Sequence, residues 1–208
     1  MSMTLTTART DIRQLLDDTG TDRYSNAMID EALEVALLEY SKRKPVSRTY
    51  VLDSTASRRI TLPADFIAMA IVDVEWVSNL ADFNDRIAFY ATKPDEQWVL
   101  ETPGNIIPLG ETMNIYYHTM HTIDGFNGES GTSVPDSDEG ILELGAAGFA
   151  SLAHATSKVE TNNLNPQEAK DMAAHGRDQI ERFYAGIGMV ESVFSHASWA
   201  DKTIDRNY

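Results

Sequence analysis

The clearest local signal in the chain lies at residues 165–188, which read NPQEAKDMAAHGRDQIERFYAGIG. Asn165 and Pro166 are typical of the first positions of a helix, and Glu168 follows near them as in a capping pair. One apolar stripe then recurs at three- and four-residue spacing, and it comprises Ala169, Met172, Ala173, Gly176, Ile180, Phe183, Tyr184 and Ile187. The pattern predicts a long amphipathic helix that ends at Gly186 and Gly188.

Two helices are predicted near the N-terminus. The first carries apolar residues on one helical face, namely Leu5, Ala8, Ile12, Leu15 and Leu16. The second begins after Ser25, a favourable N-cap, and runs towards Pro45. Both helices are amphipathic, so we expect each to pack against other helices.

A further helix is predicted after Asp136 and Glu139, which resemble a capping pair. Its interior contains Gly145 and Gly148, and each interior glycine costs about 1 kcal/mol relative to alanine. We therefore expect another backbone to pack unusually close to these two glycines. The alternative is that both are tolerated and have no packing role.

The middle of the chain changes to a period of two. Tyr50 and Leu52, then Ile60 and Leu62, alternate with polar residues on either side of a turn at residues 53–57, which predicts a hairpin. Further strands are predicted around residues 72–76, 97–101 and 113–120. The expected fold class is α+β, with about four helices from both ends of the chain, an inserted antiparallel β region and an extended C-terminal tail.

The expected division of the chain follows from these elements. Residues 1–47 and 135–188 form the helical core, residues 48–134 form the β region with its loops, and residues 189–208 form a docking tail. At 208 residues and 42% hydrophobic content, the chain can bury one core of ordinary size.

Composition excludes several classes of function. The absence of cysteine excludes disulfides, thiolate nucleophiles, iron–sulfur clusters and cysteine zinc sites. The formal charge of −15 disfavours a protein that reads nucleic-acid sequence. No apolar run approaches the roughly 20 residues of a membrane span, and residues 1–13 do not follow the pattern of a signal peptide. We expect a soluble protein that is not exported by the general route.

No catalytic, metal or cofactor site is predicted. His118 and His121 lie three residues apart in an expected strand, so they would point to opposite faces, and we expect both at the surface. The glycines around Ser130 miss the spacing of a nucleophile elbow by one residue, and no phosphate-binding glycine loop is present.

Two segments are predicted to make contacts with partners. The stretch 122–138 is long and polar, and we expect an exposed contact loop with Gly125, Phe126, Gly128 and Gly131 at its centre. The tail after Gly188 is too short to bury its own aromatic and apolar residues, which predicts a docking arm that uses Phe194, Trp199, Lys202, Ile204, Arg206 and Tyr208. The alternative is that this tail packs on its own subunit or is disordered.

Several segments in this order resemble the head-to-tail connector proteins of tailed bacteriophages, the adaptor or head-completion proteins. They are the opening helix pair, residues 60–66 (ITLPADF), residues 113–117 (MNIYY), residues 134–136 (VPD) and the helix that contains Phe183 and Tyr184. The resemblance covers most of residues 5–187. Residues 78–110 and the tail after Gly188 have no matching counterpart.

The resemblance implies a structural virion protein without a cofactor. Such adaptors form a ring, usually of twelve copies, between the capsid portal and the tail, where they extend the DNA channel and provide a platform for the tail. The implied partners are the portal protein, further copies of the chain itself and the next neck or tail protein, while DNA passes without sequence-specific binding and no membrane is involved. The implied location is the neck of the virion, after assembly in the host cytoplasm.

Three alternatives come from other classes of protein. The first is a tail-side neck or tail-completion protein, which would differ in the partner that it binds. The second is a small-molecule enzyme whose site is assembled from scattered residues in a deep pocket. The third is an acidic regulator that mimics DNA and competes with it for a basic partner.

Overall fold

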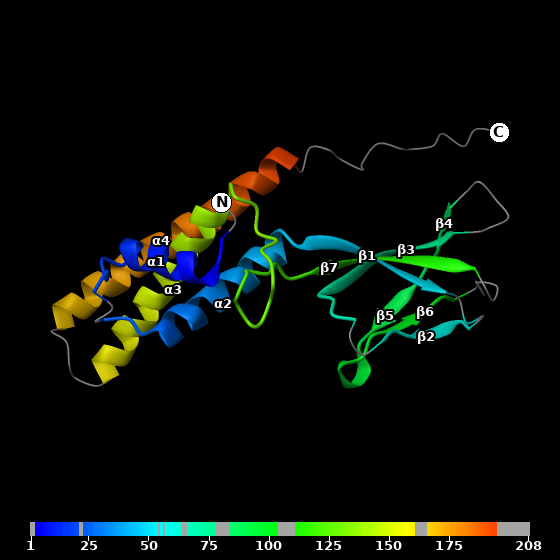
Figure 1. The fold of residues 1–208 in the computed structure, drawn as a ribbon, viewed down its shortest axis with the longest axis horizontal. Helices are drawn as coiled ribbons and strands as arrows, with labels where there is room; N and C mark the ends of the chain where they lie inside the picture. Colours follow the sequence, from blue (N-terminus) through cyan, green and yellow to red (C-terminus); the bar gives the residue numbers. More distant parts are fainter. Residues whose placement is uncertain are drawn as a thin grey trace. The chain divides into compact units, whose positions relative to one another are not determined.

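The computed structural model describes residues 3–20, 23–53, 55, 57–63, 66–77, 84–103, 111–160 and 166–194. The chain divides into two compact units, one formed by residues 1–44 with 121–208 and the other by residues 45–120. The first unit is helical and the second consists mainly of antiparallel strands, so the predicted α+β class is confirmed (Figure 1). Residues 121–134 belong to the helical unit, whereas the sequence analysis assigned them to the β region.

The described residues of the helical unit form four helices: α1 (Leu5–Leu15), α2 (Asn26–Arg43), α3 (Glu139–Glu160) and α4 (Pro166–Phe194). Side-chain oxygens begin the first two. Thr4 and Thr7 form a reciprocal capping box at α1, and the Ser25 hydroxyl accepts the Met28 N–H of α2. Helix α3 lies between α2 and α4 and contacts both (Figure 1).

Helix α4 is longer than the sequence analysis predicted. It passes through Gly186 and Gly188 and ends at Phe194. Neither glycine adopts the positive φ that commonly ends a helix, and Gly186 lies directly beside Ile141 of α3. The predicted end at these glycines was therefore wrong, and Phe194 is the last residue of α4.

The core of the helical unit is assembled from all four helices and from the segment that precedes α3. Fully buried side chains include those of Ile12, Leu33, Leu142 and Phe183. Burial of each such side chain contributes about 1.5–3 kcal/mol, so packing rather than helix propensity supplies most of the stability.

Glycines allow α3 and α4 to approach each other closely. A Cβ atom added to Gly148 would lie 2.9 Å from the Gly176 carbonyl oxygen and 2.8 Å from Ile180 Cγ1. A Cβ atom added to Gly145 would lie 2.7 Å from the Phe183 ring. Both positions that the sequence singled out thus lie against α4, and Gly176 is the matching glycine on the other helix.

In the part of the β unit that the structure describes, seven strands form two antiparallel sheets. The first sheet has the order β1 (Val46–Asp53), β7 (Thr112–Thr119), β3 (Ala70–Val77) and β4 (Asn84–Arg86). The second has the order β2 (Arg59–Thr61), β6 (Val99–Glu101) and β5 (Tyr90–Thr92), and a short 3-10 helix, Pro94–Glu96, lies between β5 and β6. Side chains from both sheets share one core, which includes Ile60, Val74, Leu100 and Ile115.

Strand pairing differs from the predicted hairpin. Strand β1 pairs with β7, with Tyr50 opposite Ile115, and β2 pairs with β6, with Ile60 opposite Leu100. The two strands expected to pair therefore belong to different sheets. In β3 the pairing with β7 shifts between Ile71 and Asp73, and Val72 at this irregularity is exposed whereas Val74 is buried.

The close approach of α3 and α4 can be tested with a pair of glycine substitutions. Gly148→Ala should lower the free energy of unfolding by about 1–3 kcal/mol, because the added methyl group meets backbone of α4. Gly140→Ala in the same helix is the control, since nothing lies within 4 Å of its Cβ position, and it should stabilise by up to about 1 kcal/mol. Urea unfolding measures both values, and equal effects would contradict the packing argument.

Candidate assembly surfaces

The segment that precedes α3 is largely built into the helical core. Ile123, Phe126 and Val134 are buried, and Leu5 N–H donates to the Asp124 carbonyl oxygen at 2.8 Å. The prediction of an exposed contact loop was therefore wrong for these residues, including Phe126. These three apolar side chains belong to the hydrophobic core of the helical unit. Polar residues surround them in the sequence, and for that reason the stretch was predicted to be an exposed loop.

The tip of this segment does remain exposed. Gly125 and Gly128 adopt positive φ values of 79° and 81°, and Asn127 between them also has a positive φ. The Glu129 N–H donates to the Phe126 carbonyl oxygen at 3.0 Å and closes the turn. Gly131 is exposed as well. The exposed part of the stretch is therefore limited to residues around this turn and to residues 135–137, just before α3.

His121 joins two segments of the helical unit and is buried, so the prediction of a surface residue was wrong. Its Nε2 lies 2.8 Å from the Lys44 carbonyl oxygen, and its Nδ1 lies 2.9 Å from the Ser133 carbonyl oxygen. Burial lowers the pKa of the imidazole. His118, in β7, is half-buried. Within the described ranges, no group of three or more His, Asp or Glu side chains is placed to hold a metal ion.

Asp138 anchors the end of α2 to the start of α3. Its carboxylate accepts hydrogen bonds from the Tyr40 hydroxyl at 2.5 Å and from Lys44 Nζ at 2.7 Å. Burial by itself would raise the pKa of Asp138, but these two hydrogen bonds outweigh it and hold the pKa below its ordinary value. Burial and the same contact raise the pKa of Tyr40.

Removal of this charge should destabilise the helical unit. Asp138→Asn leaves the ammonium group of Lys44 without its carboxylate in a site where both side chains are mostly buried, so we expect a loss of about 2–4 kcal/mol. Glu129→Gln, at an exposed carboxylate in the same chain segment, should change stability by less than about 0.5 kcal/mol. Thermal unfolding at neutral pH measures both; a small effect of Asp138→Asn would show that the ion pair is dispensable.

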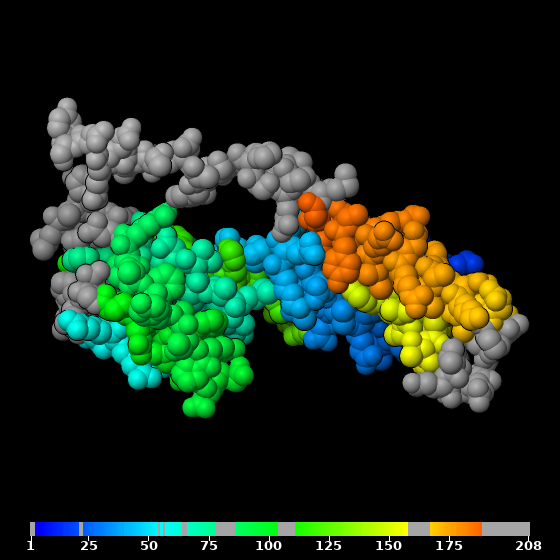
Figure 2. Space-filling view, turned by 180° about the vertical axis from the view of Figure 1, so that it is seen from behind, coloured from blue at the N-terminus to red at the C-terminus, as the bar shows by residue number. Residues whose placement is uncertain are grey.

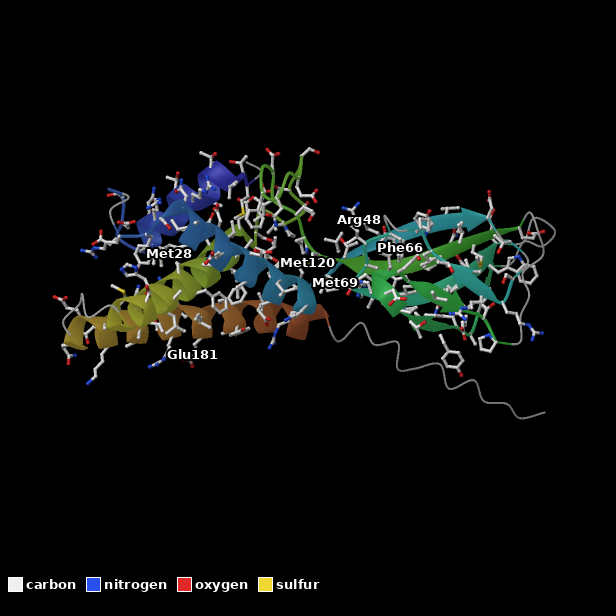
Figure 3. The ribbon with its side chains drawn as sticks, turned by 90° about the horizontal axis from the view of Figure 1, so that it is seen from below. Met28, Arg48, Phe66, Met69, Met120 and Glu181 are labelled. Atoms are coloured by element: carbon white, nitrogen blue, oxygen red, sulfur yellow. The ribbon has the colours of Figure 1, made fainter. Side chains whose placement is uncertain are left out.

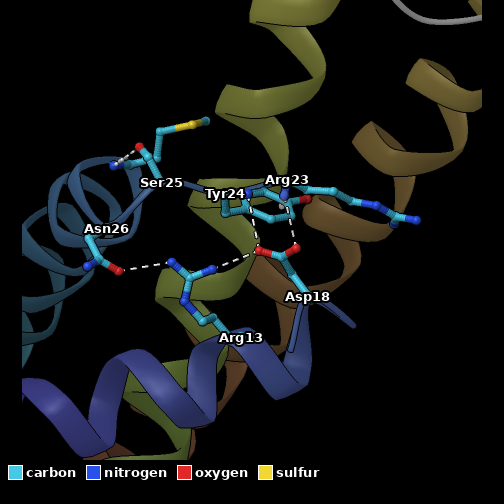
Figure 4. Close-up of polar contacts among 7 residues, drawn as sticks. Arg13, Asp18, Arg23, Tyr24, Ser25 and Asn26 are labelled. Carbon is cyan, nitrogen blue, oxygen red and sulfur yellow. Dashed lines mark hydrogen bonds and ion pairs between the residues drawn. The ribbon is translucent and has the colours of Figure 1, made fainter. Parts of the chain in front are cut away.

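A second buried ion pair lies at the turn between α1 and α2. Arg13 donates to Asp18 Oδ2 at 2.8 Å and to Asn26 Oδ1 at 2.9 Å (Figure 4). Asp18 in turn accepts the backbone N–H groups of Arg23 and Tyr24 (Figure 4). The carboxylate thereby fixes the turn between the two helices. Arg13 and Asp18 therefore form hydrogen bonds that stabilise the fold of the helical unit.

Two carboxyl groups meet where α1 packs on α3. Burial, together with the neighbouring charges of Asp11 and Glu139, raises the pKa of Glu143 to about 7. A hydrogen bond joins Glu143 to Asp11. Glu139 is occupied in its own contact, since it accepts the Met3 N–H at 2.7 Å. A protonated Glu143 suits this site better than a charged one.

The raised pKa predicts a pH dependence of stability. The folded protein holds the Glu143 proton more tightly than the unfolded chain, so this stabilisation is complete below about pH 4.5 and is lost as the pH rises through about 7. Glu143→Gln should therefore increase stability at pH 8 by about 1–2 kcal/mol and have little effect at pH 4.5. Glu181→Gln, at an exposed glutamate on α4 (Figure 3), should show no such difference between the two pH values in urea unfolding.

An apolar groove lies between α2 and α3 on the surface of the helical unit. It encloses about 660 Å³ and is lined by Met28, Glu31, Ala32, Val35, Phe149, Leu152, Ala153, Thr156 and Ser157. The surfaces of α2, in blue, and α3, in yellow, lie beside each other in Figure 2, and Met28 is labelled in Figure 3. Val35 is 43% exposed. We name this feature the α2–α3 groove.

The β unit carries further exposed apolar side chains. Ile67 and Tyr90 are 80% and 66% exposed, and Val51 and Val72 are also exposed. The side chain of Phe194 and all of residues 195–208 lie outside the described part of the structure, so Trp199, Lys202, Ile204, Arg206 and Tyr208 have no described position. No described helix is long and apolar enough to cross a membrane.

The α2–α3 groove and the Asp11–Glu143 carboxyl pair were not predicted from the sequence. Val35 lies one position before the buried residues Ala36 and Leu37, and this additional apolar residue is the one signal in the sequence that could have indicated the groove. Nothing in the sequence indicated the contact of Asp11 with Glu143, because these residues lie far apart along the chain and the protein is rich in acids.

Comparison with known proteins gives a likeness among solved structures. No protein-family model matches the chain, and no curated protein matches it. Among solved structures, a chain from the neck of an empty gene transfer agent (GTA) particle, computed with C6 symmetry, is similar. The two chains are 21% identical, the alignment covers 67% of this chain and 75% of the other, and the TM-score is 0.27.

Proposed function

We propose that this protein is a structural component of the neck of a tailed phage-like particle, where it forms an adaptor ring between the capsid portal and the tail. The observation that carries the proposal is that the buried ion pairs of the helical unit make structural contacts, while apolar side chains remain exposed on its surface. The Arg13–Asp18 pair holds the turn after α1, and the Lys44–Asp138 pair joins the end of α2 to the start of α3. The exposed apolar side chains, by contrast, are available for contacts with other proteins.

The order of segments along the chain also supports this proposal. It resembles that of the head-to-tail connectors, and the acidic composition suits a protein that surrounds DNA without holding it. The ring would contain several copies, twelve by the same resemblance, and would extend the channel that begins at the portal. The exposed backbone turn at Gly125, Gly128 and Gly131 would face a neighbouring copy or the next tail component.

In this proposal the C-terminal residues make the contact with the portal. Trp199, Ile204 and Tyr208 supply the large apolar side chains, and Lys202 and Arg206 supply positive charge in an otherwise acidic protein. Aromatic residues and arginine are common among the residues that dominate binding energy at protein interfaces. Because α4 ends at Phe194, the docking segment comprises residues 195–208.

The proposal can be tested by mixing the purified protein with portal rings from the same genome. Electron microscopy should show a second ring that is coaxial with the portal. The triple variant Trp199→Ala, Ile204→Ala, Tyr208→Ala should remain folded and lose at least about tenfold in portal affinity, because three large side chains are truncated. Ser198→Ala, Thr203→Ala, Asn207→Ala is the matched control within the same segment and should retain binding.

Two results would overturn parts of the proposal. If the folded protein fails to bind portal rings but binds tail tubes, it is a tail-side neck protein. If the triple variant joins the portal with full affinity, the portal contact is made by other residues, and the adaptor role would stand without the docking segment.

A further inference from the structure

The α2–α3 groove has an apolar floor and an acidic rim. Met28, Val35, Phe149 and Leu152 supply the apolar lining. Among the described residues that line the groove, Glu31 is the only charged one. Glu34 is also exposed, one turn further along α2. Such a surface is complementary to a peptide that presents apolar and basic side chains together.

The last residues of the same chain have this character. Residues 202–208 read KTIDRNY. Alternate residues of an extended segment face the same way, so one face would carry Lys202, Ile204, Arg206 and Tyr208. The other face would carry Thr203, Asp205 and Asn207. The acidic residue is thus separated from the two basic and two apolar residues, which can all face one surface.

The chain is long enough for this segment to return to its own groove. The contact between Gly148 and Gly176 places that level of α4 beside the part of α3 that borders the groove. From Gly176 to Phe194 helix α4 rises about 27 Å. An extended chain from Phe194 to Ile204 spans about 33–36 Å, which exceeds this distance and leaves length to pass around the side of a helix.

We propose that in the free protein residues 202–208 occupy the α2–α3 groove of their own chain. Ile204 and Tyr208 cover Val35 and Phe149, and Lys202 and Arg206 lie near the acidic rim. This contact extends beyond the proposed function, because the portal would then compete with the groove for one segment. That consequence rests on the proposed function, whereas the contact within the chain does not.

The absence of cysteine from the chain makes a specific labelling experiment possible. Asn207→Cys carries a single nitroxide label in the full-length protein, and NMR then measures its effect on backbone amides. We expect loss of signal to be strongest for residues 28–35 and 149–157, with recovery when the nitroxide is reduced. Unchanged signals at these residues would overturn the proposal.

Matched substitutions separate binding in the groove from general proximity. Val35→Lys introduces a positive charge into the groove and should abolish the signal loss. Leu15→Lys on α1 is the control, because Leu15 is 40% exposed and Val35 is 43% exposed. Glu31→Lys combined with Glu34→Lys should also weaken the effect. If Val35→Lys leaves the signal loss intact, or if Leu15→Lys abolishes it too, the groove is not the binding site.

A mixture of labelled and isotope-enriched copies tests whether the contact lies within one chain. The nitroxide is placed on copies without isotope, and the amides are observed on copies without nitroxide. Little signal loss is expected. Strong loss would mean that the segment occupies the groove of a second copy and would overturn the proposal. The portal takes no part in these measurements, so their failure is distinct from a failure of portal binding.

Discussion

The close contact of α3 with α4 fixes the framework of the helical unit. At Gly148 and Gly176 the two backbones approach so closely that a Cβ atom on either residue would lie 2.9 Å from the carbonyl oxygen of the other. This contact sets the axial register of the two helices and places the Phe183 ring over Gly145. The surface that α3 presents to α2, and therefore the α2–α3 groove, depends on that register.

Charged side chains fix the positions of α1 and α2, which the contact between α3 and α4 leaves undetermined. Apolar packing alone does not specify one position for a short helix such as α1, because many similar arrangements bury similar area. Arg13 with Asp18 fixes the turn after α1, and Arg9 makes two hydrogen bonds to Asp30 of α2 at 2.8 and 2.6 Å. Asp138 performs the same role at the other end of α2. In these contacts the ionisable groups thus position the helices relative to one another and have no catalytic role.

In the proposed arrangement, the groove and residues 202–208 would provide a physical basis for regulated assembly. Apolar side chains that remain exposed in a folded subunit are available for contacts with partners, yet they also favour uncontrolled association. A segment of the same chain that covers such a groove reduces this exposure until a partner binds more tightly. The net charge of −15 acts in the same direction, because like-charged subunits repel one another at long range.

The amino-acid sequence by itself determined the elements whose signals are local. The stripes of α1, α2 and α4, the Ser25 cap, the strands at residues 97–101 and 113–120 and the α+β class all follow from periodicity and capping, which depend on neighbouring residues. Only the tertiary structure decided which strands pair, where α4 ends, that Phe126 and His121 are buried, and that Val35 borders a groove. Each of these depends on residues far apart in the chain, and their contact energies outweigh local preference. Gly145 and Gly148 combine both sources of information. The sequence shows that each glycine lowers the stability of a helix, and the tertiary structure shows that α4 packs against both positions.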